Sequence, residues 1–80
     1  MTEVTVYSRD YCHLCQEMID ALEALGPRLG FSIRVVDVDA DQDLEDRLGE
    51  RVPVLEGDGQ EICHYVLDRA ALDAFLARFR

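Results

Sequence analysis

The pattern of hydrophobic and polar positions along the chain predicts four strands and three helices. Polar and apolar residues alternate over 3–7, which is typical of a strand, and hydrophobic residues recur at helical spacing over 12–25. The predicted strands are 3–7, 31–38, 51–56 and 60–65, and the predicted helices are 12–25, a short one after Asp39 or Asp41, and one after Asp68. This β-α-β-α-β-β-α order predicts an α/β fold, in which a right-handed crossover joins one parallel strand pair and a hairpin completes a four-stranded mixed sheet flanked by helices.

Glycine, proline and aspartate residues, which favour turns and helix ends, indicate where these elements begin and end. Gly26-Pro27 is a breaker pair that ends the first helix, after which residues 28–30 form either a last turn or a loop. Gly49 stands where a left-handed residue closes the second helix. An aspartate caps the second helix, and Asp68 caps the third, whose end is favoured by Arg78 and Arg80. Gly57-Asp58-Gly59 predicts a tight hairpin. Strand 31–38 has apolar residues on both faces, which predicts a central strand covered by helices.

Composition narrows the classes of protein to which the chain can belong. Eighty residues with 49% hydrophobic side chains predict one domain, residues 1–80. The chain has 17 acidic and 8 basic residues, a net charge of −9, and all of its basic residues are arginines. Phosphate binding needs a positive surface, so nucleic acids and anionic membranes are not expected partners. The chain has no membrane-spanning apolar run and begins without the pattern of a signal peptide, and its three cysteines fit a reducing compartment, which together predict a cytoplasmic protein. A monomer is expected.

The segment Cys12-His13-Leu14-Cys15 lies where the first strand gives way to the first helix. Free backbone N–H groups and the macrodipole favour a negative charge at a helix start, and such surroundings lower the pKa of a cysteine thiol. We therefore expect Cys12 to be a nucleophilic thiolate and Cys15 to be the resolving thiol that attacks the mixed disulfide. A protonated His13 would further favour the Cys12 thiolate.

Two other groups of residues permit more than one interpretation. Cys63 is either a small core residue or an additional redox thiol. A zinc site of Cys12, Cys15 and Cys63 with a histidine is the less favoured alternative, so no metal ligand is assigned. The acidic run 39–43 lacks the glycine and glutamate of a calcium loop, which favours helix capping over metal binding.

These residues resemble the thioredoxin superfamily, and within it the small glutaredoxin-like proteins. The resemblance covers nearly the whole chain and rests on the C-x-x-C pair and on Val52-Pro53 ahead of a hairpin. It implies a thioredoxin-like fold with a cis peptide bond between Val52 and Pro53 facing Cys12 and Cys15. It also implies that the backbone of Val52 pairs with an extended substrate segment. Tyr11, beside the nucleophile, is expected to cover the site.

The chain departs from the glutaredoxin pattern at the positions that hold glutathione. His13-Leu14 replaces Pro-Tyr, Arg51 replaces a threonine, and the Gly-Gly pair before the last helix is absent, although Asp68 matches the acidic residue that follows it. Arginines 9, 51 and 69 are the candidate groups for an anionic substrate.

The resulting hypothesis is a thiol–disulfide oxidoreductase that acts on protein disulfides or glutathione mixed disulfides. It needs no cofactor beyond glutathione as an alternative cosubstrate, and a reductase or thiol donor must regenerate it. A non-enzymatic binding module of the same fold, and less favourably a metal-binding protein, are the alternatives.

Overall fold

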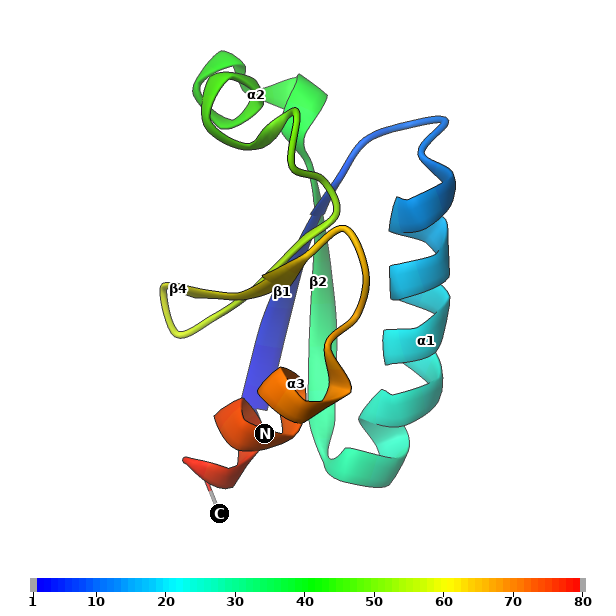
Figure 1. The fold of residues 1–80 in the computed structure, drawn as a ribbon, viewed down its shortest axis with the longest axis vertical. Coiled ribbons are helices and arrows are strands. Elements are labelled where there is room, and N and C mark those ends of the chain that lie inside the picture. The colour runs from blue at the N-terminus through cyan, green and yellow to red at the C-terminus, as the bar shows by residue number, and fades with distance from the viewer. Residues whose placement is uncertain (1, 80) are drawn as a thin grey trace.

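The computed structural model describes residues 2–79, and within them four strands form one mixed sheet with helices packed against it (Figure 1). The elements are β1 (Thr2–Ser8), α1 (His13–Leu29), β2 (Phe31–Asp37), the 3₁₀ helix η1 (Val38–Ala40), α2 (Gln42–Leu48), β3 (Val54–Gly57), β4 (Gln60–His64) and α3 (Arg69–Ala77). The strand order is β2-β1-β3-β4, with β1 parallel to β2 and antiparallel to β3, and β3 antiparallel to β4. The α/β class and the element order predicted from the sequence are confirmed.

The main core lies on one face of the sheet. Val4 and Val6 alternate along β1, are fully buried, and share a cluster with Leu22 of α1 and Leu72 of α3. Because residues two apart on a strand point to the same face, α1 and α3 must cover the same side of the sheet. The remaining members of this cluster are Met18, Phe31, Leu55, Phe75 and Leu76.

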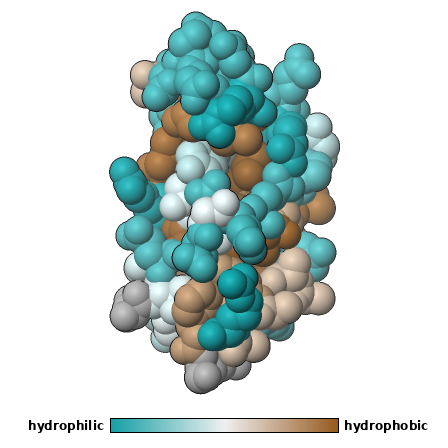
Figure 2. All heavy atoms as spheres, turned by 90° about the vertical axis from the view of Figure 1, so that its left-hand side faces the viewer, coloured by the Kyte–Doolittle hydropathy of each residue, from teal (hydrophilic) through white to brown (hydrophobic). Residues whose placement is uncertain are grey.

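A second, smaller cluster lies at the end of β1 that leads into the Cys12 loop. Its buried members are Cys15, Val38 and Val52, and Leu44 and Leu48 of α2 pack against it. Figure 1 shows α2 beyond this end of the sheet and away from its middle. Figure 2 looks onto the face turned away from α1, where hydrophilic side chains gather at the α2 end.

The prediction that 31–38 forms a central, covered strand is wrong, because β2 is an edge strand. The β1–α1–β2 unit places β2 on one side of β1, and β3 then pairs with the other side. With α2 at the end of the sheet, the second face of β2 has no helix over it. Ser32 and Arg34, which point to that face, are accordingly exposed. Val35 points to the opposite face, and it is also 48% exposed.

Helix α1 passes through the predicted stop at Gly26-Pro27 and ends four residues beyond Leu25, at Leu29. Gly30 is the residue that ends it, with a left-handed φ of 81° and its N–H bonded to the Gly26 carbonyl at 2.8 Å. Gly26 serves packing instead: a Cβ there would lie 2.7 Å from the carbonyl oxygen of Phe31. Its missing side chain therefore allows α1 to approach the start of β2.

The helix caps and the hairpin follow local sequence preferences closely. The Asp41 carboxylate accepts from the Asp43 and Leu44 N–H groups, and the Asp68 carboxylate accepts from the Ala71 N–H at 3.0 Å, so both predicted caps are present. Gly49 is different, because it has right-handed helical angles and not the predicted left-handed ones.

In the hairpin, Asp58 and Gly59 both have positive φ, 52° and 77°, as a two-residue turn of this kind requires. The strands are shorter than predicted, because β3 begins only after Pro53, which cannot donate to the ladder, and β4 ends before Tyr65. Arg80, predicted to favour the end of α3, lies outside the described residues. Within residues 2–79, no helix combines the length and the apolar character that crossing a membrane would need.

Candidate active site

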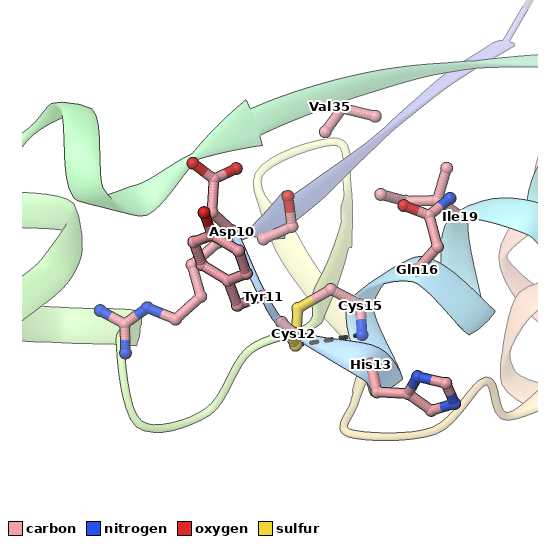
Figure 3. A pocket seen from close by; sticks show the side chains of 10 residues that line it. Asp10, Tyr11, Cys12, His13, Cys15, Gln16, Ile19 and Val35 are labelled. Atoms are coloured by element: carbon pink, nitrogen blue, oxygen red, sulfur yellow. Dashed lines mark hydrogen bonds between the residues drawn. A yellow bond between two sulfur atoms is a disulfide. The ribbon is translucent and has the colours of Figure 1, made fainter.

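Cys12 and Cys15 are joined by a disulfide at the N-terminus of α1 (Figure 3). Cys12 is the N-cap residue with extended backbone angles, and its Sγ accepts the Cys15 N–H at 3.1 Å. Their Cα atoms are 5.2 Å apart. Cys15 is only 2% exposed, whereas Cys12 is partly exposed. The two sulfurs therefore differ in access to solvent, and the more accessible one is in contact with a free amide of the helix start.

A shallow hollow of about 570 Å³ opens beside the cysteine pair. Its walls come from the loop after β1, the first turns of α1 and Val35 of β2. Tyr11 lies at its rim with a positive φ of 61° and a fully exposed side chain (Figure 3). This exposure leaves Cys12 uncovered, so Tyr11 borders the site but does not close it.

His13 lies in the first turn of α1, and its ring points away from the cysteine pair (Figure 3). The side chain is 92% exposed, and its Nε2 lies 4.0 Å from Oε1 of Glu17. The structure thus places His13 next to Cys12 in sequence but out in solvent. Its assistance to the thiolate stays a prediction.

The loop before β3 packs against the cysteine pair. Val52 is buried in the cluster that contains Cys15, and Cys12 packs against the same cluster. The Val52–Pro53 peptide bond is cis, and the Pro53 carbonyl accepts the Tyr65 N–H at 2.8 Å. Residues forty positions apart in the sequence are therefore brought together at one end of the sheet.

The three candidate arginines are all engaged with carboxylates of the chain itself. Arg51 pairs with Glu61, and Arg69 Nε donates to Asp73 at 3.0 Å. Arg9 donates to Asp39 at 2.8 Å and to Glu45 at 3.0 Å. An anionic substrate would compete with these ion pairs for each arginine. Asp68 is occupied as the cap of α3.

Arg9 also has a positioning role that the sequence did not reveal. Its Nη1 donates to the carbonyl oxygen of Gly49 at 3.1 Å, and hydrogen bonds to Asp39 and Glu45 raise its pKa. Arg9 is three residues before Cys12, and Gly49 is three residues before Val52. The guanidinium therefore ties together the two loops that meet at the site. An arginine ahead of a cysteine gives no indication of its acceptors, so sequence alone could not assign this contact.

Cys63 lies apart from the disulfide as a free thiol on β4. It packs against the main core, its Sγ is 3.5 Å from the Asp68 N–H, and burial raises the pKa of its thiol. These surroundings match the interpretation as a small core residue. Among the described residues, no group of three or more His, Cys, Asp or Glu side chains is arranged to hold a metal ion.

Tyr7 packs on the buried side of the cysteine pair. It packs against the cluster of Cys15 and Val52, and its hydroxyl donates to Glu56 at 3.1 Å. Burial, together with the Glu56 carboxylate, raises the pKa of this tyrosine. The second cluster therefore packs against the buried side of the cysteine pair.

Comparison with known proteins places this arrangement in a family. Residues 3–77 match the model of the glutaredoxin-like domain (DUF836). The chain is 31% identical to the uncharacterized protein Rv0508 of Mycobacterium tuberculosis over 81 residues, covering 95% of this chain and 84% of that protein.

Two solved structures extend the likeness to the fold. The solution structure of protein Ne2328 from Nitrosomonas europaea has a TM-score of 0.82 and 37% identity, covering 92% of this chain and 89% of that one. Thioredoxin 1 of Thermosipho africanus, 16% identical, has a TM-score of 0.65 over 96% of this chain and 97% of its own, which is a likeness of fold. A thioredoxin-like fold with a C-x-x-C pair at a helix start supports a redox function. The chain belongs to the glutaredoxin-like (DUF836) family and has a thioredoxin-like fold.

Proposed function

We propose that this chain is a dithiol–disulfide oxidoreductase in which Cys12 is the nucleophile and Cys15 the resolving thiol. One observation carries the proposal: Cys12 is the N-cap of α1, partly exposed, with its Sγ in contact with the Cys15 N–H, while Cys15 is buried. A thiolate at Cys12 gains a charge-assisted hydrogen bond and a favourable helix dipole. Because Cys15 is buried, its sulfur cannot reach the disulfide of a substrate, so the first attack is assigned to Cys12.

The proposed reaction moves two electrons from the cysteine pair to the substrate. The Cys12 thiolate attacks one sulfur of a substrate disulfide, forming a mixed disulfide and releasing the other sulfur as a thiolate. Cys15 then loses its proton to solvent and attacks Cys12 Sγ, which releases the second substrate thiolate. The chain is left with the Cys12–Cys15 disulfide, and an external dithiol or reductase must reduce it. The proposed cytoplasmic setting would supply such a donor.

The proposed substrate is an extended protein segment that contains the disulfide. Val52 packs in the same buried cluster as Cys15 and Cys12, and Pro53 follows it in the loop, so a segment adding along this loop would place its disulfide near Cys12. A protein disulfide fits better than glutathione, because the candidate arginines 9, 51 and 69 are already paired with carboxylates. No metal or organic cofactor takes part in this scheme.

The test compares the wild-type chain with single cysteine variants. Turnover is measured on a protein disulfide with a dithiol donor, and separately on a glutathione mixed disulfide with glutathione. We expect Cys12→Ser to abolish both, Cys15→Ser to accumulate mixed disulfides, and Cys63→Ser to behave like wild type. Identical behaviour of the Cys12 and Cys15 variants would refute the assigned roles. Absence of turnover on every substrate would favour a binding module of the same fold.

A further inference from the structure

A second hollow, of about 170 Å³, lies between the first turns of α1 and the segment that joins β4 to α3. Most of its walls are apolar. The residues that line it are Leu14, Glu17, Met18, Tyr65, Val66 and Leu67. Leu14, Tyr65 and Val66 are 42%, 45% and 64% exposed, which is unusual for large hydrophobic side chains gathered around one hollow.

This hollow adjoins the cysteine pair. Leu14 stands between Cys12 and Cys15 in the first turn of α1. On the other wall, Tyr65 is held by the hydrogen bond from its N–H to the carbonyl oxygen of Pro53. A substrate segment bound along the Val52–Pro53 loop with its disulfide at Cys12 would therefore carry a neighbouring side chain to this hollow.

The charge of the hollow selects among possible side chains. Glu17 is the one carboxylate among the residues lining it, and no arginine lines it. The His13 imidazole lies 4.0 Å from the Glu17 carboxylate and leaves it 63% exposed. The chain as a whole carries a net charge of −9. A cationic group is therefore favoured at this carboxylate, and an anionic one is repelled.

We propose that this hollow is a specificity site for a lysine or arginine next to the attacked cysteine of a protein substrate. The aliphatic stem packs on Leu14 and Val66, and the charged head pairs with Glu17. Long basic side chains combine these two properties, because the methylene stem is apolar and the end is charged. This inference rests on the proposed function and adds to it the class of substrate sequence.

The experiment uses short peptides whose single cysteine carries a small aromatic thiol as a mixed disulfide. Matched peptides have lysine, norleucine or glutamate at the position before or after the cysteine, and kcat/KM is measured with the reduced protein. We expect the lysine peptide to react about two- to five-fold faster than norleucine at one of the two positions, as for a partly exposed ion pair. The glutamate peptide is expected to be slowest, and added salt is expected to reduce the differences.

Three variants test the assignment to this hollow. Glu17→Gln should remove the preference for lysine over norleucine, and Val66→Ser should slow both peptides. Glu23→Gln, an exposed acid further along α1, is the matched control and should leave the preference intact. Each of these side chains is exposed, so the variants are expected to fold.

The outcomes separate this inference from the function on which it rests. If the wild-type chain reacts with none of the peptides, the proposed function fails. If all peptides react equally, or if the lysine preference survives Glu17→Gln, the function stands and the specificity site is refuted. A preference lost equally in Glu23→Gln would show that net charge, and not this hollow, selects the substrate.

Discussion

Reduction of the Cys12–Cys15 disulfide is expected to lower the free energy of unfolding. The fold holds the two Cα atoms 5.2 Å apart at the start of α1, so the disulfide acts mainly on the unfolded chain. With a sequence separation of 3, it closes a loop of four residues. In the chain-entropy model such a loop is worth about 1.9 kcal/mol at 25 °C, or roughly a 25-fold change in the unfolding equilibrium constant.

The size of this difference should depend on pH, because the reduced form carries an ionisable Cys12 at the helix N-cap. The contact with the Cys15 N–H would favour a thiolate at Cys12 in the folded chain, so we expect the reduced folded chain to release this proton more readily than the unfolded chain. Over the pH range in which the unfolded chain binds more protons than the folded one, the stability of the reduced protein rises with pH. A charge at a helix N-terminus is worth about 0.3–2 kcal/mol. The oxidised-minus-reduced difference should therefore fall, by up to that amount, between about pH 6 and about pH 9, because an ordinary cysteine thiol titrates near 8.5.

The assay is urea unfolding of the oxidised and the reduced protein, followed by far-ultraviolet circular dichroism across this pH range. Cys63 is a thiol in both forms, so its contribution cancels. Cys15→Ser is the control, because a reductant should not change its stability. A reduced form as stable as the oxidised one at about pH 6, where thiols are protonated, would refute the loop-entropy reasoning. A difference that stays constant or widens toward about pH 9 would refute a stabilised thiolate at Cys12.

Three further predictions concern packing, capping and the free thiol. Gly57→Ala should destabilise the protein by about 1–3 kcal/mol in urea unfolding, because the new Cβ would lie 2.6 Å from Cε1 of Phe75; an unchanged midpoint would contradict this packing. Asp68→Ala should cost about 0.5–2 kcal/mol and lower Tm, since the Ala71 N–H loses its cap; equal stability would mean that the cap is dispensable. In the reduced native protein, alkylation should be slower at Cys63 than at Cys12, because burial raises the pKa of Cys63; mass spectrometry showing the reverse order would overturn the assignment of the reactive thiol.

The parts of the fold that depend on local chemistry were predictable from the sequence. Asp41 and Asp68 cap helices because their carboxylates reach nearby backbone N–H groups. Asp58 and Gly59 form the hairpin turn because both residues tolerate positive φ. The end of α1 was not predictable in this way. Gly26 looks like a breaker, but its role is the close approach to Phe31, which is a tertiary contact.

The position of β2 at the sheet edge was also beyond the sequence pattern. Apolar residues on both faces favour a buried strand, yet Val35 faces the open hollow beside the cysteines. β2 lies at the sheet edge because β3 pairs with the other side of β1. This long-range pairing is not encoded in the local pattern of residues 31–37.

For the site, the C-x-x-C spacing and its place at a helix start identified Cys12 and Cys15. The closeness of Val52 was known only from the resemblance to glutaredoxin-like proteins, because no local pattern links it to the pair. The contact of Arg9 with Gly49 and the hollow beside Val66 arise from side-chain directions in the folded chain. These features were therefore found in the structure alone.

The most direct test of the central claim is to locate the covalent adduct on the reduced Cys15→Ser protein. The protein is mixed with a disulfide-containing peptide, digested without reductant and analysed by mass spectrometry. We predict a stable mixed disulfide on Cys12, formed faster than any on Cys63. An adduct confined to Cys63, or no adduct while small thiol reagents still react, would contradict Cys12 as the nucleophile.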